Sequence, residues 1–493
     1  MSQRVFEIDE LARLVSHHLV STNRESAVSL ACTCRLLEVP VLSSLWELQD
    51  SLLTLIGALP MMDEEVTEHD SSENTWRRFR RYASWMRRLL LREEDERWAT
   101  DDIFNHLLAG STGGLVCPNL RHLTCYLTTT NARFIPHFLS PHLTHLTIRV
   151  RPIYQGIVRG LPPDLGPILQ ILPTPCLREI SIDLGLNGMD HLKDKTDSMI
   201  RRCGDSLRVL SIPIPLGEAA VCHILRLKHL RIWDRVCSLP PATLPPSATF
   251  PPLQTLILNR KEAYGWISRL ARRERGISDA HDGSLEYAGL QATLKRLGFC
   301  ESVPIDATFI SPFSLLPNLV ILYIRLNCWE VVGCAFSLTN RDIVQLSAAL
   351  PRLEALDLGP PCPANTCLTT ISCFLALSVH CRGLYNSRIH FNTANLVNDI
   401  RSLLEDPYFR ELRSLPTRCS LKFFFAGSLP FPPGTSDEDV TTIAAGLIDI
   451  FPSILSILSH DSPGWMLLRS RVRELQEIKT PLLAGTESPQ IRS

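Results

Sequence analysis

The sequence predicts an α/β protein in which amino-terminal helices are followed by an irregular solenoid of short repeated strands. Three observations predict this class. Leucine accounts for 79 of the 493 residues, far above any other residue type. A six-residue leucine pattern recurs nine times between residues 120 and 358. The first sixty residues instead carry apolar side chains at the three- and four-residue spacing of amphipathic helices.

The helical region begins at the amino terminus. Apolar spacing predicts a first helix over residues 8–19. A second helix is predicted over 26–37 and a third over 41–59, with a break or kink at Pro40, because proline lacks the amide hydrogen that a helix interior uses. These helices define a domain over residues 1–60, and the acidic, turn-prone residues that follow predict a solvated linker.

Connecting helices are predicted over the rest of residues 61–116. An apolar stripe at helical spacing runs from Trp76 to Leu90, and six arginines occupy the other faces. The arginines suggest a phosphate contact, but between residues 63 and 98 eight Arg stand beside ten Asp and Glu. A salt-bridged, solvated helix is therefore the favoured interpretation. The net charge of −1 gives no global argument for binding nucleic acid or anionic membranes.

Short units of the form L-x-x-L-x-Φ, where Φ is apolar, begin after Cys117. The alternation of their fourth and sixth positions is the period of a strand with one face inward, and one strand per ~20 to 29 residues is the signature of leucine-rich repeats. Successive units lie 20 to 41 residues apart, and only one has the ninth-position asparagine of regular repeats, Asn327. We therefore expect an uneven horseshoe over residues 117–460. The nine units begin at Leu120, Leu143, Leu177, Leu207, Leu227, Leu253, Leu294, Leu319 and Leu353.

Two insertions interrupt the predicted solenoid. Residues 238–252 hold six prolines, which predict an extended surface loop, and residues 260–284 are charged and begin with a helical pattern. Within the solenoid, Thr339 or Asn340 is expected to cap a helix that ends before Pro351. After Leu384 the repeat is expected to fade. The remaining predictions are a helix over 441–450, a final strand over 454–458, and a closing helix with a disordered tail over 461–493.

No catalytic or metal-binding motif is present in the sequence. The chain has no Walker-type phosphate loop, no dinucleotide-binding glycine pattern, no G-x-S-x-G and no H-E-x-x-H. Its 16 cysteines include no C-x-x-C pair, so we expect reduced and mostly buried thiols. The sequence therefore predicts no enzyme, no cofactor and no metal site.

Targeting segments are not predicted either. Acidic residues lie in the first ten positions, where a signal peptide needs a basic segment before an apolar run. No apolar run approaches the ~18 residues of a membrane-spanning helix. The expectation is a cytoplasmic or nuclear protein that binds neither membranes nor nucleic acids.

The helical start resembles an F-box, in the form common in large families of F-box proteins with degenerate leucine-rich repeats in mushroom-forming fungi. The resemblance is carried by IDELARLVSHHL (8–19), SLACTCRLL (29–37) and VLSSLWELQDSLLTLIGALP (41–60), and it continues into the arginine helix and into CPNLRHL (117–123). Asp9 departs from the usual proline and Leu37 from the usual aromatic residue. The matching residues are Ile8 at the opening aliphatic position, Cys34 and Arg35 in the second segment, and the pair Leu45 and Trp46.

The resemblance implies an adaptor function without chemistry of its own. The F-box would bind a SKP-type adaptor and through it a cullin, while the repeats would present an unknown protein substrate for ubiquitin transfer by other subunits. One alternative is a repeat scaffold with a vestigial F-box and no ligase role, and another is an enzyme or a nucleic-acid binder that uses the arginine helix. The residues expected to bind the adaptor are Ile8, Leu11, Leu14, Val15, Leu45 and Trp46, with part of Leu14, Val15, Leu30 and Leu36 serving the internal core.

Strand alternation also predicts a surface for the substrate. In each unit the third, fifth and seventh residues should point out from the concave face, and aromatic and arginine side chains are enriched at binding hot spots. The alternative is that these residues are ordinary exposed side chains and that loops at the sheet edge recognise the partner. The residues predicted to line the surface are Tyr126, Arg149, Arg231, Trp233, Tyr323 and Arg325.

Overall fold

The computed structural model of the chain divides into two units. Unit 1 comprises residues 1–230 and unit 2 residues 231–493, and each is described by itself. The described residues are 9–57, 72–92, 101–111, 113–128, 131–150, 164–172, 174–183, 190–236, 252–258, 293–299, 305–324, 336–358, 367–389, 391–413, 419, 421–427, 431–459 and 463–484.

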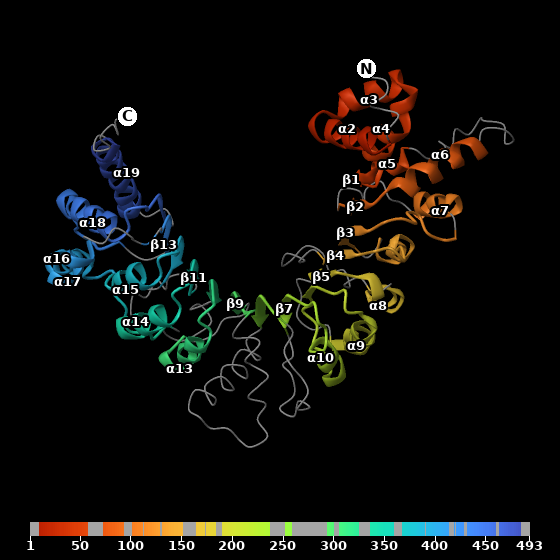
Figure 1. The fold of residues 1–493 in the computed structure, drawn as a ribbon. Helices are drawn as coiled ribbons and strands as arrows, with labels where there is room; N and C mark the ends of the chain where they lie inside the picture. The colour runs from red at the N-terminus through yellow and green to blue at the C-terminus, as the bar shows by residue number, and fades with distance from the viewer. Residues whose placement is uncertain are drawn as a thin grey trace, which may run out of the picture. The chain divides into compact units, whose positions relative to one another are not determined.

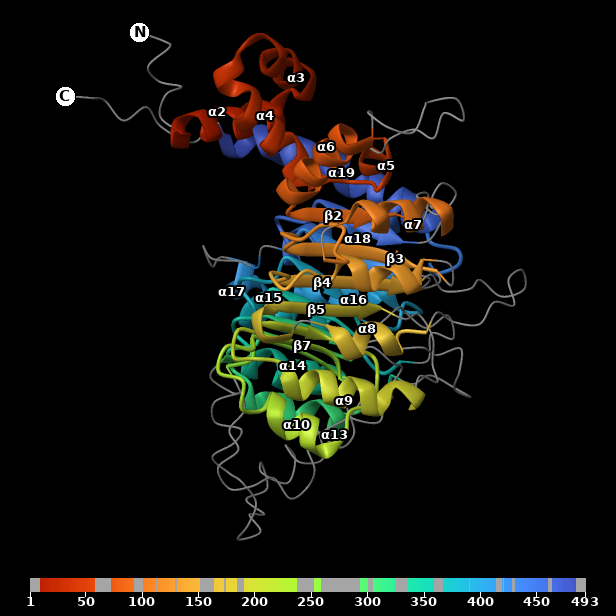
Figure 2. The same ribbon diagram turned by 90° about the vertical axis from the view of Figure 1, so that its right-hand side faces the viewer.

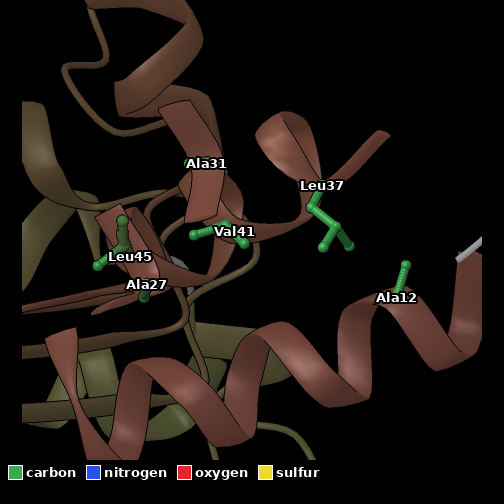
Figure 3. Packing of buried hydrophobic residues seen from close by; sticks show 6 residues of the cluster. All are labelled: Ala12, Ala27, Ala31, Leu37, Val41 and Leu45. Carbon is green, nitrogen blue, oxygen red and sulfur yellow. The ribbon is translucent and has the colours of Figure 1, made fainter. Parts of the chain in front are cut away.

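Unit 1 begins with short helices that pack around a small apolar core. Six buried side chains form this core, and Ala12 of the first helix lies toward Leu37 of the third (Figure 3). Alanine at half of the six positions lets the helices approach closely. The other core residues are Ala27, Ala31, Val41 and Leu45. The helices are α2 (Asp9–Thr22), α3 (Arg24–Thr33), α4 (Arg35–Glu47) and α5 (Leu53–Ile56).

The break between the second and third helices lies at Cys34 and not, as predicted, at Pro40. Cys34 has extended backbone angles, φ −127° and ψ 104°, and separates α3 from α4. Pro40 lies inside α4, where its missing amide hydrogen removes one hydrogen bond. Burial of Leu37 and Val41 on either side of Pro40 favours the continuous helix.

The arginine-rich helix begins and ends earlier than predicted. α6 covers Ser72–Trp85, and Arg88–Leu91 form strand β2 rather than a further helical turn. Met86 is completely buried at the place that the first leucine has in later units, and Leu89 is buried at the fourth position. Because methionine replaces the first leucine, the leucine pattern did not identify this unit. The sheet therefore begins before the predicted boundary at residue 117.

The strands of unit 1 form a parallel sheet in chain order, from β1 to β6. Strands β2 to β5 run side by side in Figure 2, and α7 to α10 lie along one side of the sheet in Figure 1. The first strand, β1, follows α4 directly, so the helical segment continues into the sheet. The other strands and helices of unit 1 are β1 (Leu48–Gln49), β3 (His122–Leu127), β4 (His145–Val150), β5 (Glu179–Asp183), β6 (Val209–Ser211), α7 (Asp101–Gly110), η2 (Ala132–Phe138), α8 (Gly166–Ile171), η3 (Thr174–Cys176), η4 (Asp190–Leu192), α9 (Lys193–Arg202) and α10 (Glu218–Ile224).

The alternation predicted for the leucine units is confirmed in unit 1. Strand β3 alternates between partly exposed and buried side chains from His122 to Leu127, and β4 and β5 follow the same pattern. The first leucine closes the turn before each strand, since the Leu120 amide donates to the Cys117 carbonyl (3.2 Å) and the Leu143 amide to the Ser140 carbonyl (3.0 Å). The fourth and sixth residues therefore form the core, and the third and fifth form the open face of the sheet.

Unit 2 repeats this arrangement with strands β7 to β14, again parallel and in chain order. Helices α13 to α18 lie along one side of these strands in Figure 1. The strands are β7 (Ile232–Val236), β8 (Thr255–Leu258), β9 (Arg296–Phe299), β10 (Ile321–Ile324), β11 (Ala355–Asp357), β12 (Asn386–Arg388), β13 (Phe423–Gly427) and β14 (Ser456–Ser459). The helices are α13 (Ala307–Ile310), η5 (Ser311–Leu315), α14 (Asn340–Ala349), α15 (Cys373–His380), α16 (Leu396–Glu405), α17 (Pro407–Arg413), α18 (Asp437–Ile450) and α19 (Pro463–Ala484).

The expectation that the repeat fades after Leu384 is wrong. Strands β12, β13 and β14 continue the sheet to Ser459. Their fourth positions hold Ser387, Phe424 and Ile457, all buried, in place of leucine. The fourth position therefore stays buried in these units although it no longer holds leucine.

Helix caps in unit 2 follow the sequence. The Thr339 hydroxyl accepts from the Asp342 amide and the Asp342 carboxylate accepts from the Thr339 amide (2.8 Å), which together form a capping box on α14. Ser436 and Asp439 form the same box on α18. The cap predicted at Thr339 is therefore confirmed.

One leucine unit has a different register from the predicted one. Ile232 pairs with Thr255, which is the third residue of the next unit, so this unit begins at Leu230 and not at Leu227. The run from Leu227 fits L-x-x-L-x-Φ, whereas the run from Leu230 has Trp233 at its fourth position, so strand pairing and not the leucine pattern identifies the register. Arg231 consequently takes the second position and Trp233 the fourth, which points inward.

Several predictions fall outside the described residues. They are the acidic linker over 63–71, residues 238–251 of the first insertion, the second insertion over 260–284, Asn327 and the tail beyond residue 484.

Within the ranges given above, no helix is both long and apolar enough to cross a membrane.

Candidate functional site

Exposed apolar side chains gather on the first three helices of unit 1. On α2, Leu11, Leu14 and Val15 have spacing i, i+3, i+4 and therefore share one face of the helix, with Leu14 66% exposed. On α4, Leu36 and Val39 are 48% and 44% exposed. Together with Val28 of α3, these residues are called the helical apolar surface. Exposed apolar residues clustered in this way mark an interaction site more often than scattered ones do.

A groove of about 500 Å³ joins the two main helices of this surface. Leu14 of α2 and Val39 of α4 both line it, so the apolar faces of the two helices meet there. Its polar lining includes Arg13, His17 and Glu47. The groove therefore combines apolar walls with charged groups, as protein-binding grooves commonly do.

Two residues expected to bind the adaptor are engaged in contacts within unit 1. Leu45 is 6% exposed and belongs to the core of the helical segment. The Trp46 ring stacks on the Tyr82 ring of α6, with centroids 4.4 Å apart and planes 8° from parallel. Conversely, Leu14, Val15 and Leu36, expected to serve the core in part, are exposed. Ala12 and Ser16 fill the buried face of α2, and Leu37 and Val41 fill that of α4. Ile8 lies outside the described residues.

Replacing Trp46 by alanine should lower the free energy of unfolding of unit 1 by about 2 kcal/mol, because the stack on Tyr82 and its packing against the helical core are lost. Trp46→Phe should retain most of the stability. Urea unfolding followed by circular dichroism measures the difference. Equal stability of the alanine variant and the parent would show that the stack contributes nothing to the fold.

The predicted substrate residues of unit 1 contact each other. Tyr126 and Arg149 are register partners on β3 and β4, and Nη1 of Arg149 donates to the Tyr126 hydroxyl at 2.9 Å. The guanidinium also lies 5.7 Å from the centre of the Tyr126 ring. Both side chains reach the open face, so this pair lies where alternation predicted.

The predicted substrate residues of unit 2 do not form one patch. Tyr323 is 41% exposed on β10 and Arg231 is exposed before β7, several strands away. Trp233 is only 3% exposed, which corrects its prediction as a surface residue, because the unit begins three residues later than expected. Arg325 lies outside the described residues.

A histidine pair lies on the open face of unit 1. His122 and His145 occupy the third positions of β3 and β4, and their rings stack with centroids 4.0 Å apart. Partial burial, His145 and the charges of Arg88 and Arg121 lower the pKa of His122 to about 4. Partial burial also lowers the pKa of His145, against the opposing effect of Glu179 and with the help of Arg178, Arg88 and Arg208. Both rings are therefore neutral near pH 7.

The histidine pair should make the stability of unit 1 fall as the solution is acidified. Because the folded pKa of His122 is about 4 and its ordinary value is 6.5, the unfolded chain binds a proton between these pH values that the folded chain does not. The free energy of unfolding should therefore decrease from pH 7 toward pH 4. Thermal unfolding of the parent and of His122→Gln/His145→Gln at pH 7 and pH 5 measures it, and the variant should lose less. An equal loss in both proteins would contradict the prediction.

Sequence reasoning missed two sets of exposed residues at the second and third positions of the units. In unit 1, arginines recur at the second position, a signal readable in the leucine units themselves. In unit 2, Tyr385 directly before β12, Phe423 at the start of β13 and Leu455 directly before β14 are 37%, 38% and 64% exposed. The second set was missed because these units carry no leucine at the fourth position.

Buried thiols account for most of the described cysteines. Burial raises the pKa of Cys125 and of Cys203 to about 12, so both stay protonated. Within the described ranges, His, Cys, Asp and Glu side chains form no group of three or more that could hold a metal ion.

The geometry therefore offers two surfaces, the helical apolar surface and the open face of the strands, both suited to binding a protein. No model of a known protein family matches the chain, and no curated protein gives a significant match.

Proposed function

We propose that the chain is the substrate-recognition subunit of an SCF-type ubiquitin ligase. In this proposal the helices α2 to α4 are an F-box that binds a SKP-type adaptor, and the parallel strands are leucine-rich repeats that bind a protein substrate. The chain itself would perform no chemistry, and the adaptor would connect it to a cullin.

The observation that carries the proposal is the helical apolar surface. Leu11, Leu14 and Val15 of α2, with Leu36 and Val39 of α4, remain exposed although the same helices bury a core of their own. A small helical segment that leaves this much apolar area in water gains stability when a partner covers it. The resemblance of residues 8–60 to an F-box names the adaptor as that partner.

A second candidate function rests on a different observation. Leu45 and Trp46, both matched to the F-box pattern, are engaged within the chain, Leu45 in the core and Trp46 on Tyr82. This favours a scaffold in which the helices only cap the first strands and no ligase is assembled.

Co-purification separates the two functions. The full chain, mixed with a purified SKP-type adaptor, should elute with it from a size-exclusion column. Failure of the full chain to bind the adaptor at micromolar concentration would reject the ligase proposal and leave the scaffold.

A further inference from the structure

A row of basic side chains follows one edge of the unit 1 sheet. The residue before the first paired position of each strand, the second position of its unit, is arginine in four of five consecutive strands from β2 to β6. These residues are neighbours through the backbone, since the Arg121 amide donates to the Arg87 carbonyl (2.8 Å) and the Arg208 amide to the Arg178 carbonyl (2.7 Å). The second positions are Arg87, Arg121, Thr144, Arg178 and Arg208.

Three exposed arginines of this row, together with Arg88 next to Arg87, form the part that a ligand can reach. They are called the arginine edge and comprise Arg121, Arg178 and Arg208, with Arg88 at the third position of β2. Arg87 is half-buried and donates to the Asn119 carbonyl at 3.1 Å, so it is structural. Across the described residues, no carboxylate lies within ion-pair distance of the four arginines of the edge.

The positive charge of the arginines acts on the two stacked histidines. Arg88 and Arg121 both depress the pKa of His122, and Arg88, Arg178 and Arg208 depress that of His145. Glu179, at the third position of β5, is the carboxylate that opposes this field at His145. The edge is thus a concentration of positive charge on a chain whose net charge is −1.

The repeat architecture alone does not produce this charge. The same second positions in unit 2 hold residues of every class. They are Arg231, Gln254, Lys295, Val320, Glu354, Tyr385, Lys422 and Leu455. The arginine edge is therefore a feature of unit 1 and not of the strand geometry.

Hydroxyl groups lie beside the edge on the same open face. The fifth positions of β3, β4 and β5 are register partners, and they are Thr124, Thr147 and Ser181, whereas Ser211 at the same position of β6 is buried. Hydroxyls both donate and accept hydrogen bonds and can serve peptide groups as well as carboxylates. Among the described residues of β2 to β6, no Phe, Tyr or Trp occupies a third or fifth position. The rings on this face are His122 and His145, which stack on each other, and Tyr126, which accepts a hydrogen bond from Arg149, whereas single-stranded nucleic acids bind on a series of stacking rings.

We propose that the arginine edge binds an acidic, extended segment of a protein partner. Adjacent strands lie about 4.8 Å apart, so the row from β2 to β6 spans about 19 Å, which an extended segment of about six residues covers. Alternate side chains of such a segment would present carboxylates to the arginines while its backbone passes the hydroxyl row. That the partner is a ubiquitination substrate rests on the proposed function, whereas binding at the edge does not.

Fluorescence anisotropy tests the proposal with a defined probe. A fluorescein-labelled (Glu-Gly)5 peptide should bind the full chain, and a (Gln-Gly)5 peptide should not. Arg121→Gln/Arg178→Gln/Arg208→Gln should weaken binding of the Glu peptide about tenfold or more, and the corresponding triple lysine variant should retain most of it. Binding by the parent should weaken as NaCl is raised from 50 to 300 mM.

A matched control removes three exposed arginines from helices of the same unit. Arg77→Gln/Arg78→Gln/Arg201→Gln makes the same change in net charge and should leave the peptide affinity unchanged. Thermal unfolding checks that both glutamine variants are folded. Equal binding of the two peptides, unchanged binding by the edge variant, equal weakening by the control, or tighter binding of a ten-nucleotide oligothymidine would each overturn the proposal.

Adaptor capture, measured on the same preparations, keeps the two proposals separate. Loss of peptide binding in the edge variant with adaptor capture intact supports the edge. Absence of adaptor capture in the parent rejects the ligase function and leaves the result at the edge unaffected.

Discussion

Replacing Leu14 and Val39 by glutamate should abolish capture of the SKP-type adaptor by the full chain. The two side chains are 66% and 44% exposed and line the same groove, so each charge would lie within the covered surface. Loss of an interface anchor commonly costs about 2 kcal/mol or more, and two such losses correspond to nearly a thousandfold in Kd. The fold should be retained because neither residue belongs to the core of the helical segment.

Ile171→Glu is the matched control for this experiment. Ile171 is 52% exposed on α8 of the same unit, away from the helical apolar surface. It should leave adaptor capture unchanged in isothermal titration calorimetry. Undiminished capture by Leu14→Glu/Val39→Glu would show that the adaptor, if bound, uses a different surface.

Replacing Trp233 by alanine should lower the free energy of unfolding of unit 2 by about 3 to 5 kcal/mol. Its side chain is 3% exposed at the fourth position of its unit, so truncation opens a large cavity between β7 and the layer beneath it. Arg231→Ala changes an exposed side chain and should stay within about 0.5 kcal/mol of the parent. Chemical unfolding followed by tryptophan fluorescence and circular dichroism measures both.

This pair of variants also tests the strand register. If the unit began at Leu227, Trp233 would be a surface residue and its loss would cost little. A larger effect of Arg231→Ala than of Trp233→Ala would therefore restore the register predicted from the leucine pattern.

Periodicity predicted the parts of the fold in which one residue type always occupies the same environment. Leucine at the fourth position located strands such as β3, β4 and β5, because burial of one face requires that side chain. Thr339 located the start of α14, because a cap acts through its own neighbours. Buried positions that several kinds of side chain can fill were not predictable from leucine alone. Met86 at the first position of one unit and Ser387 at the fourth position of another are examples.

The candidate site was predicted less well than the strands, for a physical reason. Leu14 and Leu45 carry the same side chain, and the sequence does not say which leucine faces the core and which faces a partner. That division depends on how α2, α4 and α6 pack, including the stack of Trp46 on Tyr82. The arginine edge, in contrast, could have been predicted, because arginine recurs at the second position of the early leucine units.

The direct passage from α4 into β1 fixes the distance between the amino-terminal helices and each strand of the unit 1 sheet. No linker separates the two, and β1 is held by pairing of Leu48 with Arg88 and by the Arg87 amide on the Glu47 carbonyl (3.0 Å). Each strand beyond β1 adds a fixed step of about 4.8 Å. A protein partner bound at a given strand would therefore lie at a set distance from a partner bound by the helices. Deletion or insertion of one unit would change that distance by one step without altering either contact.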